Sequence, residues 1–273
     1  MTSSIRHLKP GQPRWNSDKH EFKPYNPFVE KDLISILFLA CNNPELTRVC
    51  LDSTLQMLSG YSGEYELLFM ENGNNEDNYK LFYNVAHERK KIIRSDNWGI
   101  MSAFNDLFAI ARGEFCFIHE NDFLNSNPSA NILFSSISVL KFDQEVGSVY
   151  IRNIHDPNEN WGYRKPEYLP YTCDANQNQS ANITVTECTT NNGIVYQKAN
   201  HPNWYNNNPC LIRKKIWTDY GPFNEPMVGS CPKHDETHFQ HRTANIGYKG
   251  AYIPNSPYIH IGGARSHEFK SRR

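Results

Sequence analysis

The chain has 273 residues and a formal net charge of −1, and charged residues make up 21% of the sequence. This length is sufficient for one large domain with a buried core. The balanced charge argues against a broad nucleic-acid-binding surface, and the composition is that of a folded chain, not a disordered one.

The two ends of the sequence differ from its middle. Residues 1–30 are polar and lack a regular hydrophobic period, so we expect an N-terminal extension that is either draped over the fold or loose. Residues 267–273 are rich in basic residues and are expected to form a solvated tail, with binding to an anionic phosphate or membrane as the alternative. The N-terminus lacks the apolar core of a signal peptide, and no apolar run approaches the ~20 residues of a membrane span. We therefore expect a cytoplasmic protein.

The cysteines also favour a reducing compartment. Their number is odd, no Cys-x-x-Cys motif occurs, and several lie in apolar runs, which together favour buried free thiols over disulfides. The seven cysteines are Cys41, Cys50, Cys116, Cys173, Cys188, Cys210 and Cys231.

Alternating strands and helices are predicted after the extension. The continuous apolar run LISILFLA, residues 33–40, predicts a strand buried on both faces. A helical period follows it, with Pro44 suited to the first helical position. A second buried strand is expected at 65–70 and a polar amphipathic helix at about 76–89.

The alternation continues to residue 119 and defines the fold class. A short strand is expected at 91–95, and a helix at 99–111 that Arg112 and Gly113 would end. Residues 114–119 predict another buried strand. This order indicates β-α-β units and an α/β fold with a mostly parallel sheet flanked by helices. Ligands of such sheets bind beyond the carboxyl ends of the strands, where this sequence reads CNNP, ENGN and ENDF.

The second half of the sequence is less regular. Residues from about 150 to 210 are rich in Asn, Pro, Tyr and Trp, and we expect long irregular chain with a functional role there. A strand leading into a short helix is expected at 210–223, and a helix, a glycine stop and a strand at 235–254.

Two carboxylates at the end of the strand 114–119 form the first candidate site. Glu120 and Asp122 can point into one pocket, and two oxygen donors close together suit Mg²⁺ or Mn²⁺. The alternative is a turn or a helix N-cap, both of which favour Asp and Asn.

Two further segments could contribute to a ligand-binding site, and a third is considered next. Asn97, Gly99 and Asn105 lie at the opening of a predicted helix, where phosphate is attracted, although a plain cap would look the same. His260, in YIHIGG, could offer an imidazole to a metal held by Asp122, or be structural.

The segment HDETHFQHR, residues 234–242, lacks the Glu that a zinc protease needs directly after its first His. Its acid pair, Asp235 and Glu236, could instead supply a general base or interact with a helix dipole.

Taken together, these motifs resemble a known family. The order of SILFLACNNPELTRVCLDS, YELLFMENGN, NWGIMSAFN, GEFCFIHEND, GPFNE, DETHF and HIGGARS is similar to that of GT-A fold glycosyltransferases of the family-2-like group. The resemblance covers about residues 33–266. It implies one GT-A domain at 31–266, with a nucleotide-binding half (31–125) and an acceptor-binding half (126–266).

The resemblance also implies roles for individual residues. Asp122 and His260 would bind the divalent cation, and Glu120 would lie near the ribose or the metal. Glu236 or Asp235 would be the catalytic base, with the register favouring Glu236. Nucleotide-sugar contacts would come from Ala40, Asn42, Glu71, Asn97, Gly99, Asn105, Glu120 and Arg265.

The implied reaction moves a sugar from a nucleotide-sugar donor, expected to be a UDP-sugar, to a hydroxyl of a glycan or glycoconjugate, with inversion. The expected acceptor contacts are Trp161, Trp204 and Tyr205, because aromatic faces stack on sugar rings. A packed loop is the alternative for this aromatic segment.

Other readings stay open or are disfavoured. A sugar nucleotidyltransferase would need a Gly-rich loop after the first strand, and ACNNPEL has no glycine. A non-catalytic carbohydrate-binding protein on the same fold, or a retaining enzyme, remains an alternative.

Overall fold

The structure is a computed structural model that describes residues 6–7, 28–97, 99–153, 185–199, 209–220, 223 and 247–262. The chain divides into two compact units, which we describe separately. Unit 1 comprises Met1–Arg48, Gly63–Asn121 and Ile212–Thr243, and unit 2 comprises Val49–Ser62, Asp122–Leu211 and Ala244–Arg273. The long helix α1 (Pro44–Ser59) begins in unit 1 and continues in unit 2.

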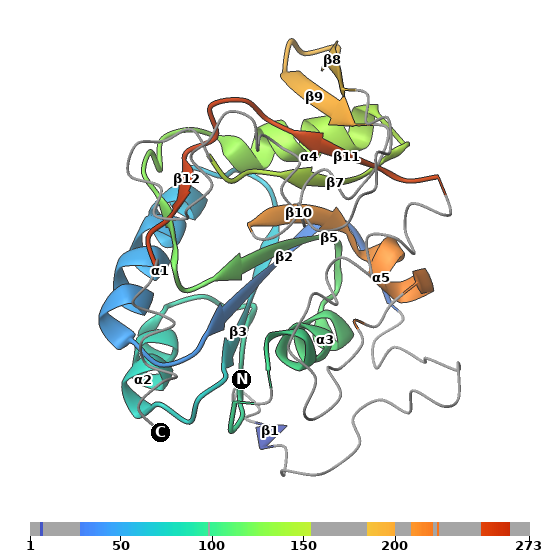
Figure 1. The fold of residues 1–273 in the computed structure, drawn as a ribbon. Coiled ribbons are helices and arrows are strands. Elements are labelled where there is room, and N and C mark those ends of the chain that lie inside the picture. Colours follow the sequence, from blue (N-terminus) through green and yellow to red (C-terminus); the bar gives the residue numbers. More distant parts are fainter. Residues whose placement is uncertain are drawn as a thin grey trace, which may run out of the picture. The chain divides into compact units, whose positions relative to one another are not determined.

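Unit 1 contains a parallel sheet with the strand order β1-β4-β3-β2-β5 (Figure 1). Neighbouring strands are parallel throughout this order. The strands are β1 (Arg6–His7), β2 (Glu30–Ala40), β3 (Tyr65–Glu71), β4 (Lys90–Arg94) and β5 (Gly113–Glu120). Residues 33–40 of β2 are all buried, as the continuous apolar run predicts. The predicted parallel α/β core is confirmed.

Two helices of unit 1 lie on opposite faces of this sheet (Figure 1). They are α2 (Glu76–Asn84), which Asn75 caps through bonds to the amides of Asp77 and Asn78, and α3 (Ile100–Ile110). The opposite placement follows from the strand order, since the connection from β4 returns across the sheet to β5. Helix α2 ends earlier than predicted because Val85 is extended.

The residues predicted to end helix α3 have a different function. The helix ends at Ile110, with Ala111 as an extended C-cap, and Gly113 is the first residue of β5. A Cβ on Gly113 would lie 2.6 Å from the backbone nitrogen of Ser35 and 2.7 Å from the carbonyl oxygen of Leu33. Glycine is therefore needed here for close strand approach and not as a helix cap.

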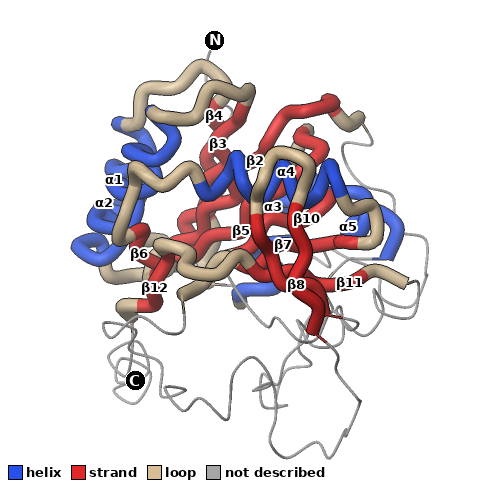
Figure 2. Tube along the Cα trace, turned by 90° about the horizontal axis from the view of Figure 1, so that it is seen from above, coloured by secondary structure: helices blue, strands red, loops and turns tan. Residues whose placement is uncertain are grey.

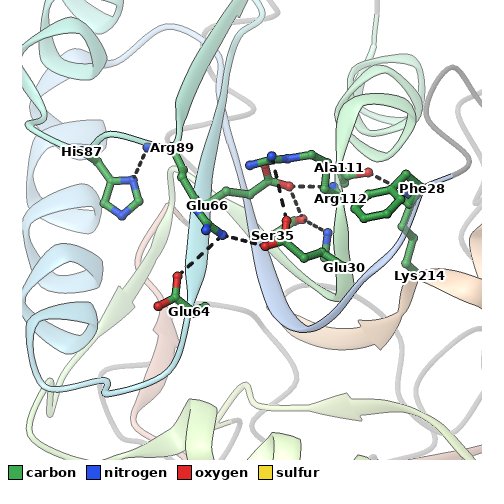
Figure 3. Close-up of polar contacts among 11 residues, drawn as sticks. Phe28, Glu30, Ser35, Glu64, Glu66, His87, Arg89, Ala111, Arg112 and Lys214 are labelled. Carbon is green, nitrogen blue, oxygen red and sulfur yellow. Dashed lines mark hydrogen bonds and ion pairs between the residues drawn. The ribbon is translucent and has the colours of Figure 1, made fainter. Parts of the chain in front are cut away.

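A buried polar network joins the beginnings of the strands in unit 1 (Figure 3). The Glu66 carboxylate, 1% exposed, accepts bonds from the Ser35 hydroxyl at 2.7 Å and from the backbone and Nε of Arg112 at 2.6 and 3.1 Å. Glu30 pairs with Arg89 at 3.0 Å. Because these contacts lie at the opposite end of the strands from the candidate site, we assign them a structural role.

A buried lysine, Lys214, also forms hydrogen bonds near the beginnings of these strands. The Lys214 ammonium group donates to the carbonyl of Ala111, the C-cap of α3, and to that of Phe28 at 3.5 Å (Figure 3). Burial lowers the pKa of Lys214. Lys214 begins helix α5 (Lys214–Tyr220), which follows strand β10 (Cys210–Arg213), so the predicted strand and short helix are confirmed.

Unit 2 contains a mixed arrangement of strands. Its larger group has the order β7-β11-β9-β8, in which only the β7–β11 pair is parallel. A separate antiparallel pair joins β6 and β12 (Figure 2). The elements are β6 (Phe123–Asn125), α4 (Ile132–Phe142), β7 (Val146–Tyr150), β8 (Val185–Thr189), β9 (Val195–Ala199), β11 (Lys249–Tyr252) and β12 (Tyr258–His260).

The hairpin β8–β9 corrects the expectation of irregular chain throughout 150–210. It is held to the α4–β7 connection by Asp143, which accepts bonds from the Tyr196 hydroxyl at 2.9 Å and the Lys198 ammonium group at 2.7 Å. Residues 154–184 and 200–208 lie outside the described residues, as does the helix predicted after residue 234. The strand predicted near 250 is confirmed as β11.

Two further expectations concern the cysteines and membrane-spanning segments. The five cysteines in the described ranges are free thiols, while Cys173 and Cys231 lie outside those ranges. Within the described part of the chain, each helix is too short or too polar to cross a lipid bilayer.

Candidate active site

The carboxyl ends of three neighbouring strands in unit 1 bring predicted site residues together. Ala40, at the end of β2, pairs with Glu71, at the end of β3. On the other side of β2, Leu39 pairs with Glu120, the last residue of β5. The edge of the sheet predicted from the loops CNNP, ENGN and ENDF is therefore formed by adjacent strands.

Asparagine residues shape the loops at this edge. Asn42 has φ 57°, Asn74 has φ 52° and Asn97 has φ 49°, a left-handed conformation that Asn tolerates better than most residues. The backbone carbonyl of Asn42 accepts bonds from the side chains of Asn78 at 3.0 Å and Asn121 at 3.3 Å. These bonds fix the loop after β2 and leave the Asn42 side chain exposed.

Asn121 holds the end of β5 in a defined position. Its side-chain amide also donates to the Thr47 hydroxyl of α1 at 2.8 Å. Asn121 lies between Glu120 and Asp122 in the sequence, so this bond orients the turn that carries both carboxylates. The sequence motif alone did not reveal this role.

The Glu71 carboxylate is fully buried, with 0% exposure, and within the described chain neither oxygen makes a well-formed hydrogen bond. Burial raises the pKa of Glu71, and the Asn75 amide and the Arg94 guanidinium, 4.0 Å away, oppose this shift only in part. The backbone amides of Gly73, Asn74 and Asn75 lie near this carboxylate without well-formed hydrogen bonds, so a ligand donor that reached it would be favourable.

Asn72 ties the loop after β3 to the start of α3, and the sequence analysis did not identify it. Its side-chain oxygen accepts a bond from the Ser95 hydroxyl at 2.6 Å, and its amide donates to the Gly99 carbonyl at 3.2 Å. Gly99 is the N-cap of α3, has φ 89° and provides no side-chain cap. A helix start of this kind attracts anions.

Asn105 is used by the fold itself. The side chain is 0% exposed, and its oxygen accepts bonds from the Phe223 amide at 2.9 Å and the Trp217 indole at 3.1 Å. Its amide donates to the Phe223 carbonyl at 2.8 Å. Since these three bonds engage the side chain without a ligand, we leave Asn105 out of the proposed donor site.

In unit 2, Asp122 and His260 lie in direct contact. The His260 Nε2 and Asp122 Oδ2 atoms are 3.0 Å apart, and the side chains are 4% and 18% exposed. The pairing of β6 with β12 sets this contact, because His260 pairs with Phe123 and the Ile261 amide donates to the Asp122 carbonyl at 2.9 Å.

The Asp122–His260 pair fits a divalent cation in chemistry and spacing. The Oδ1 atom of Asp122 is buried and has no hydrogen-bond partner among the described residues. An octahedral ion with bonds of about 2.1 Å holds adjacent donor atoms roughly 3 Å apart, close to the observed separation. In the described ranges no three His, Cys, Asp or Glu side chains form a metal-binding group, so an ion held by Asp122 and His260 would need further ligands.

Cys50 is a buried thiol close to Asp122. It is 0% exposed, and burial, followed by the charge of Asp122, raises the pKa of its thiol.

Six other predicted site residues lie outside the described residues, so their roles stay predictions. They are Asp235, Glu236, Arg265, Trp161, Trp204 and Tyr205. Glu120 is partly buried at the end of β5, and its expected contact with ribose or metal also stays a prediction.

A mostly parallel sheet flanked by helices is the core of the GT-A glycosyltransferase fold. The sequence matches the family model for glycosyl transferase family 2 over residues 35–201, and the chain belongs to this family. No curated protein sequence matches it.

Solved structures show the same fold at low identity. The Pyrobaculum calidifontis mannosyltransferase PcManGT, solved with GDP-Man and Mn²⁺, has a TM-score of 0.57 and 14% identity, with 88% of this chain and 60% of that chain covered. S. aureus TarS 1–349 has a TM-score of 0.54 and 13% identity, with 86% and 62% covered. The chain therefore spans about three fifths of their length.

The contacts of Asn105 lead to a prediction about stability. Replacing Asn105 with Ala should lower the free energy of unfolding by ~2–4 kcal/mol, because it leaves buried groups of Trp217 and Phe223 without partners. Urea denaturation would measure this change, with the exposed Asn127→Ala as the control. A stable Asn105→Ala variant that had lost nucleotide affinity would contradict the structural role.

Proposed function

We propose that this chain is a metal-dependent glycosyltransferase that moves a sugar from a nucleotide-sugar to a hydroxyl of a glycan or glycoconjugate. The observation that carries the proposal is the contact between Asp122 and His260. It places a carboxylate oxygen and an imidazole nitrogen together, two residues after the strand β5 of the family's core sheet. Family membership and the complexes of similar structures support it.

The nucleoside diphosphate would bind at the carboxyl edge of the sheet in unit 1. Ala40, Asn42 and Glu71 would contact the base, and the start of α3 at Gly99, together with Asn97, would attract phosphate. We expect a UDP-sugar donor. TarS has been solved with UDP and with UDP-GlcNAc, and PcManGT with GDP-Man, so both nucleotides belong in any test.

Asp122 and His260 would hold Mn²⁺ or Mg²⁺, and diphosphate oxygens would complete the shell. The cation would stabilise the negative charge that develops on the leaving nucleoside diphosphate. Arg265 would add positive charge, and Glu120 would contact the ribose or the metal.

Glu236, or Asp235 beside it, would accept the proton of the acceptor hydroxyl. Loss of this proton makes the acceptor oxygen a stronger nucleophile as the new bond to the sugar forms. Attack from the face opposite the nucleotide would invert the anomeric centre. Trp161, Trp204 and Tyr205 would stack on the acceptor sugar. We propose residues 31–125 as the nucleotide-binding half, 126–266 as the acceptor-binding half, and a cytoplasmic location.

The direct test is turnover with a panel of nucleotide-sugars. Incubation with UDP- and GDP-sugars, with and without Mn²⁺, should give donor hydrolysis or transfer that depends on the metal. Absence of turnover with every donor, combined with retained glycan binding, would favour a non-catalytic carbohydrate-binding protein. NMR of the product anomer would distinguish inversion from retention.

Asp122→Ala should remove the metal-dependent part of nucleotide affinity. Substitution of a residue that hydrogen-bonds to a metal ligand typically lowers metal affinity by about 10–100-fold. Loss of the ligand itself should therefore lower the metal-dependent nucleotide affinity by at least ~100-fold. Titration of UDP and GDP in the presence of Mn²⁺ would measure it, and Asp52→Ala, an exposed aspartate of α1, is the control. Undiminished affinity in the Asp122 variant would argue against the metal role.

Glu236→Gln should reduce transfer by ~10²–10⁴-fold and leave donor binding intact, because a neutral amide cannot accept the proton. Initial rates of transfer and donor titration would be compared with those of Asp235→Asn. If Asp235→Asn loses transfer and Glu236→Gln does not, the base is Asp235.

A further inference from the structure

Gly262 lies against the Asp122 side chain more closely than any other residue type could. A Cβ built on Gly262 would lie 2.6 Å from Asp122 Oδ2, 2.7 Å from its Cβ and 3.0 Å from its Cγ. Real Cβ atoms do not approach other heavy atoms to 2.6 or 2.7 Å, so any side chain at position 262 would displace Asp122 or the backbone of residues 260–262.

The backbone conformation does not explain this glycine. Gly262 is not among the residues with positive φ, whereas Gly99, Gly193 and Gly247 are. A residue with a side chain could therefore adopt the backbone angles at position 262. The requirement for glycine comes from the space that Asp122 occupies.

The same short segment contacts Asp122 in two other ways. The Ile261 amide donates to the Asp122 carbonyl at 2.9 Å, and His260 Nε2 lies 3.0 Å from Oδ2, the oxygen that Gly262 also approaches. Residues 260–262 thus contact both the backbone and the carboxylate of Asp122. The Oδ1 atom is buried and without a hydrogen-bond partner in the described part of the chain.

We propose that Gly262 is a positioning residue for the metal site. Its missing side chain lets the strand that carries His260 press against Asp122, and this contact fixes the carboxylate at the spacing from the imidazole that one divalent ion requires. The inference rests on the proposed function, since it assumes that Asp122 and His260 bind the ion. Gly262 itself contributes no ligand.

The test measures Mn²⁺ binding directly and not turnover. Electron paramagnetic resonance would follow binding of Mn²⁺ to the full chain, alone and with UDP or GDP. Gly262→Ala should weaken Mn²⁺ affinity by about 10–100-fold, the range for residues that orient metal ligands. Gly60→Ala is the matched control, because a Cβ at position 60 would contact only the Met57 carbonyl oxygen, at an ordinary 3.6 Å. The Mn²⁺ affinity of the Gly60→Ala variant should equal that of the wild-type chain.

The outcomes separate the two claims. If the wild-type chain binds Mn²⁺ and Gly262→Ala binds it equally well, the positioning role is overturned and the proposed function stands. If the wild-type chain binds no Mn²⁺ even with nucleotide, the proposed metal site fails and the inference fails with it.

A double-mutant cycle covers the case in which Gly262→Ala folds poorly. Asp122→Gly removes every Asp122 side-chain atom that the new methyl group would meet. Without metal, Gly262→Ala should therefore lower the melting temperature much less in the Asp122→Gly background than in the wild-type chain. Equal losses in the two backgrounds would show that the methyl group conflicts with something other than Asp122, which would overturn the proposal.

Discussion

The contact between Asp122 and His260 is the interaction on which the functional account depends. It joins side chains 138 positions apart in the sequence, at 3.0 Å, through the antiparallel pairing of two three-residue strands, β6 and β12. Strands this short provide few backbone hydrogen bonds, so packing around the two side chains must add to the β6–β12 pairing in fixing their geometry. Gly262, which follows β12, leaves room for the Asp122 carboxylate, and the Ile261 amide donates to the Asp122 carbonyl. Both contacts are consistent with that requirement.

The residues at the carboxyl edge of the unit 1 sheet are positioned in a different way. Parallel strands bring Ala40, Glu71 and Glu120 together through register alone. The loops beyond them are then held by side-chain amides, of which Asn72 and Asn121 each make two bonds. Amides can donate and accept without carrying charge, so they organise these loops without adding negative charge where a diphosphate would bind.

The sequence predicted the strands and helices of the core well, but it did not predict the hairpin β8–β9 or contacts between residues distant in sequence. Both outcomes have physical reasons. Buried strands such as residues 33–40 are visible because both faces are apolar, and helices because their apolar residues recur. The hairpin β8–β9 was missed because it lies close to Asn-rich sequence and only Tyr196 and Ala199 of its two strands are buried, so no apolar run marks it. The structural contacts of Asn105 and Gly113 could not be foreseen because they involve Phe223 and Ser35, partners distant in sequence that no local pattern reveals. The approach of His260 to Asp122 was expected as one of two alternatives for this histidine, and the family resemblance favoured it.

A crystal structure of the chain with Mn²⁺ and a nucleoside diphosphate, with data collected at the manganese absorption edge, would test the central claim most directly. The account predicts an anomalous peak within coordination distance of both the Asp122 carboxylate and His260 Nε2, bridged to the diphosphate. Bound nucleotide with manganese absent from that position, or with Asp122 and His260 still hydrogen-bonded to each other, would contradict it.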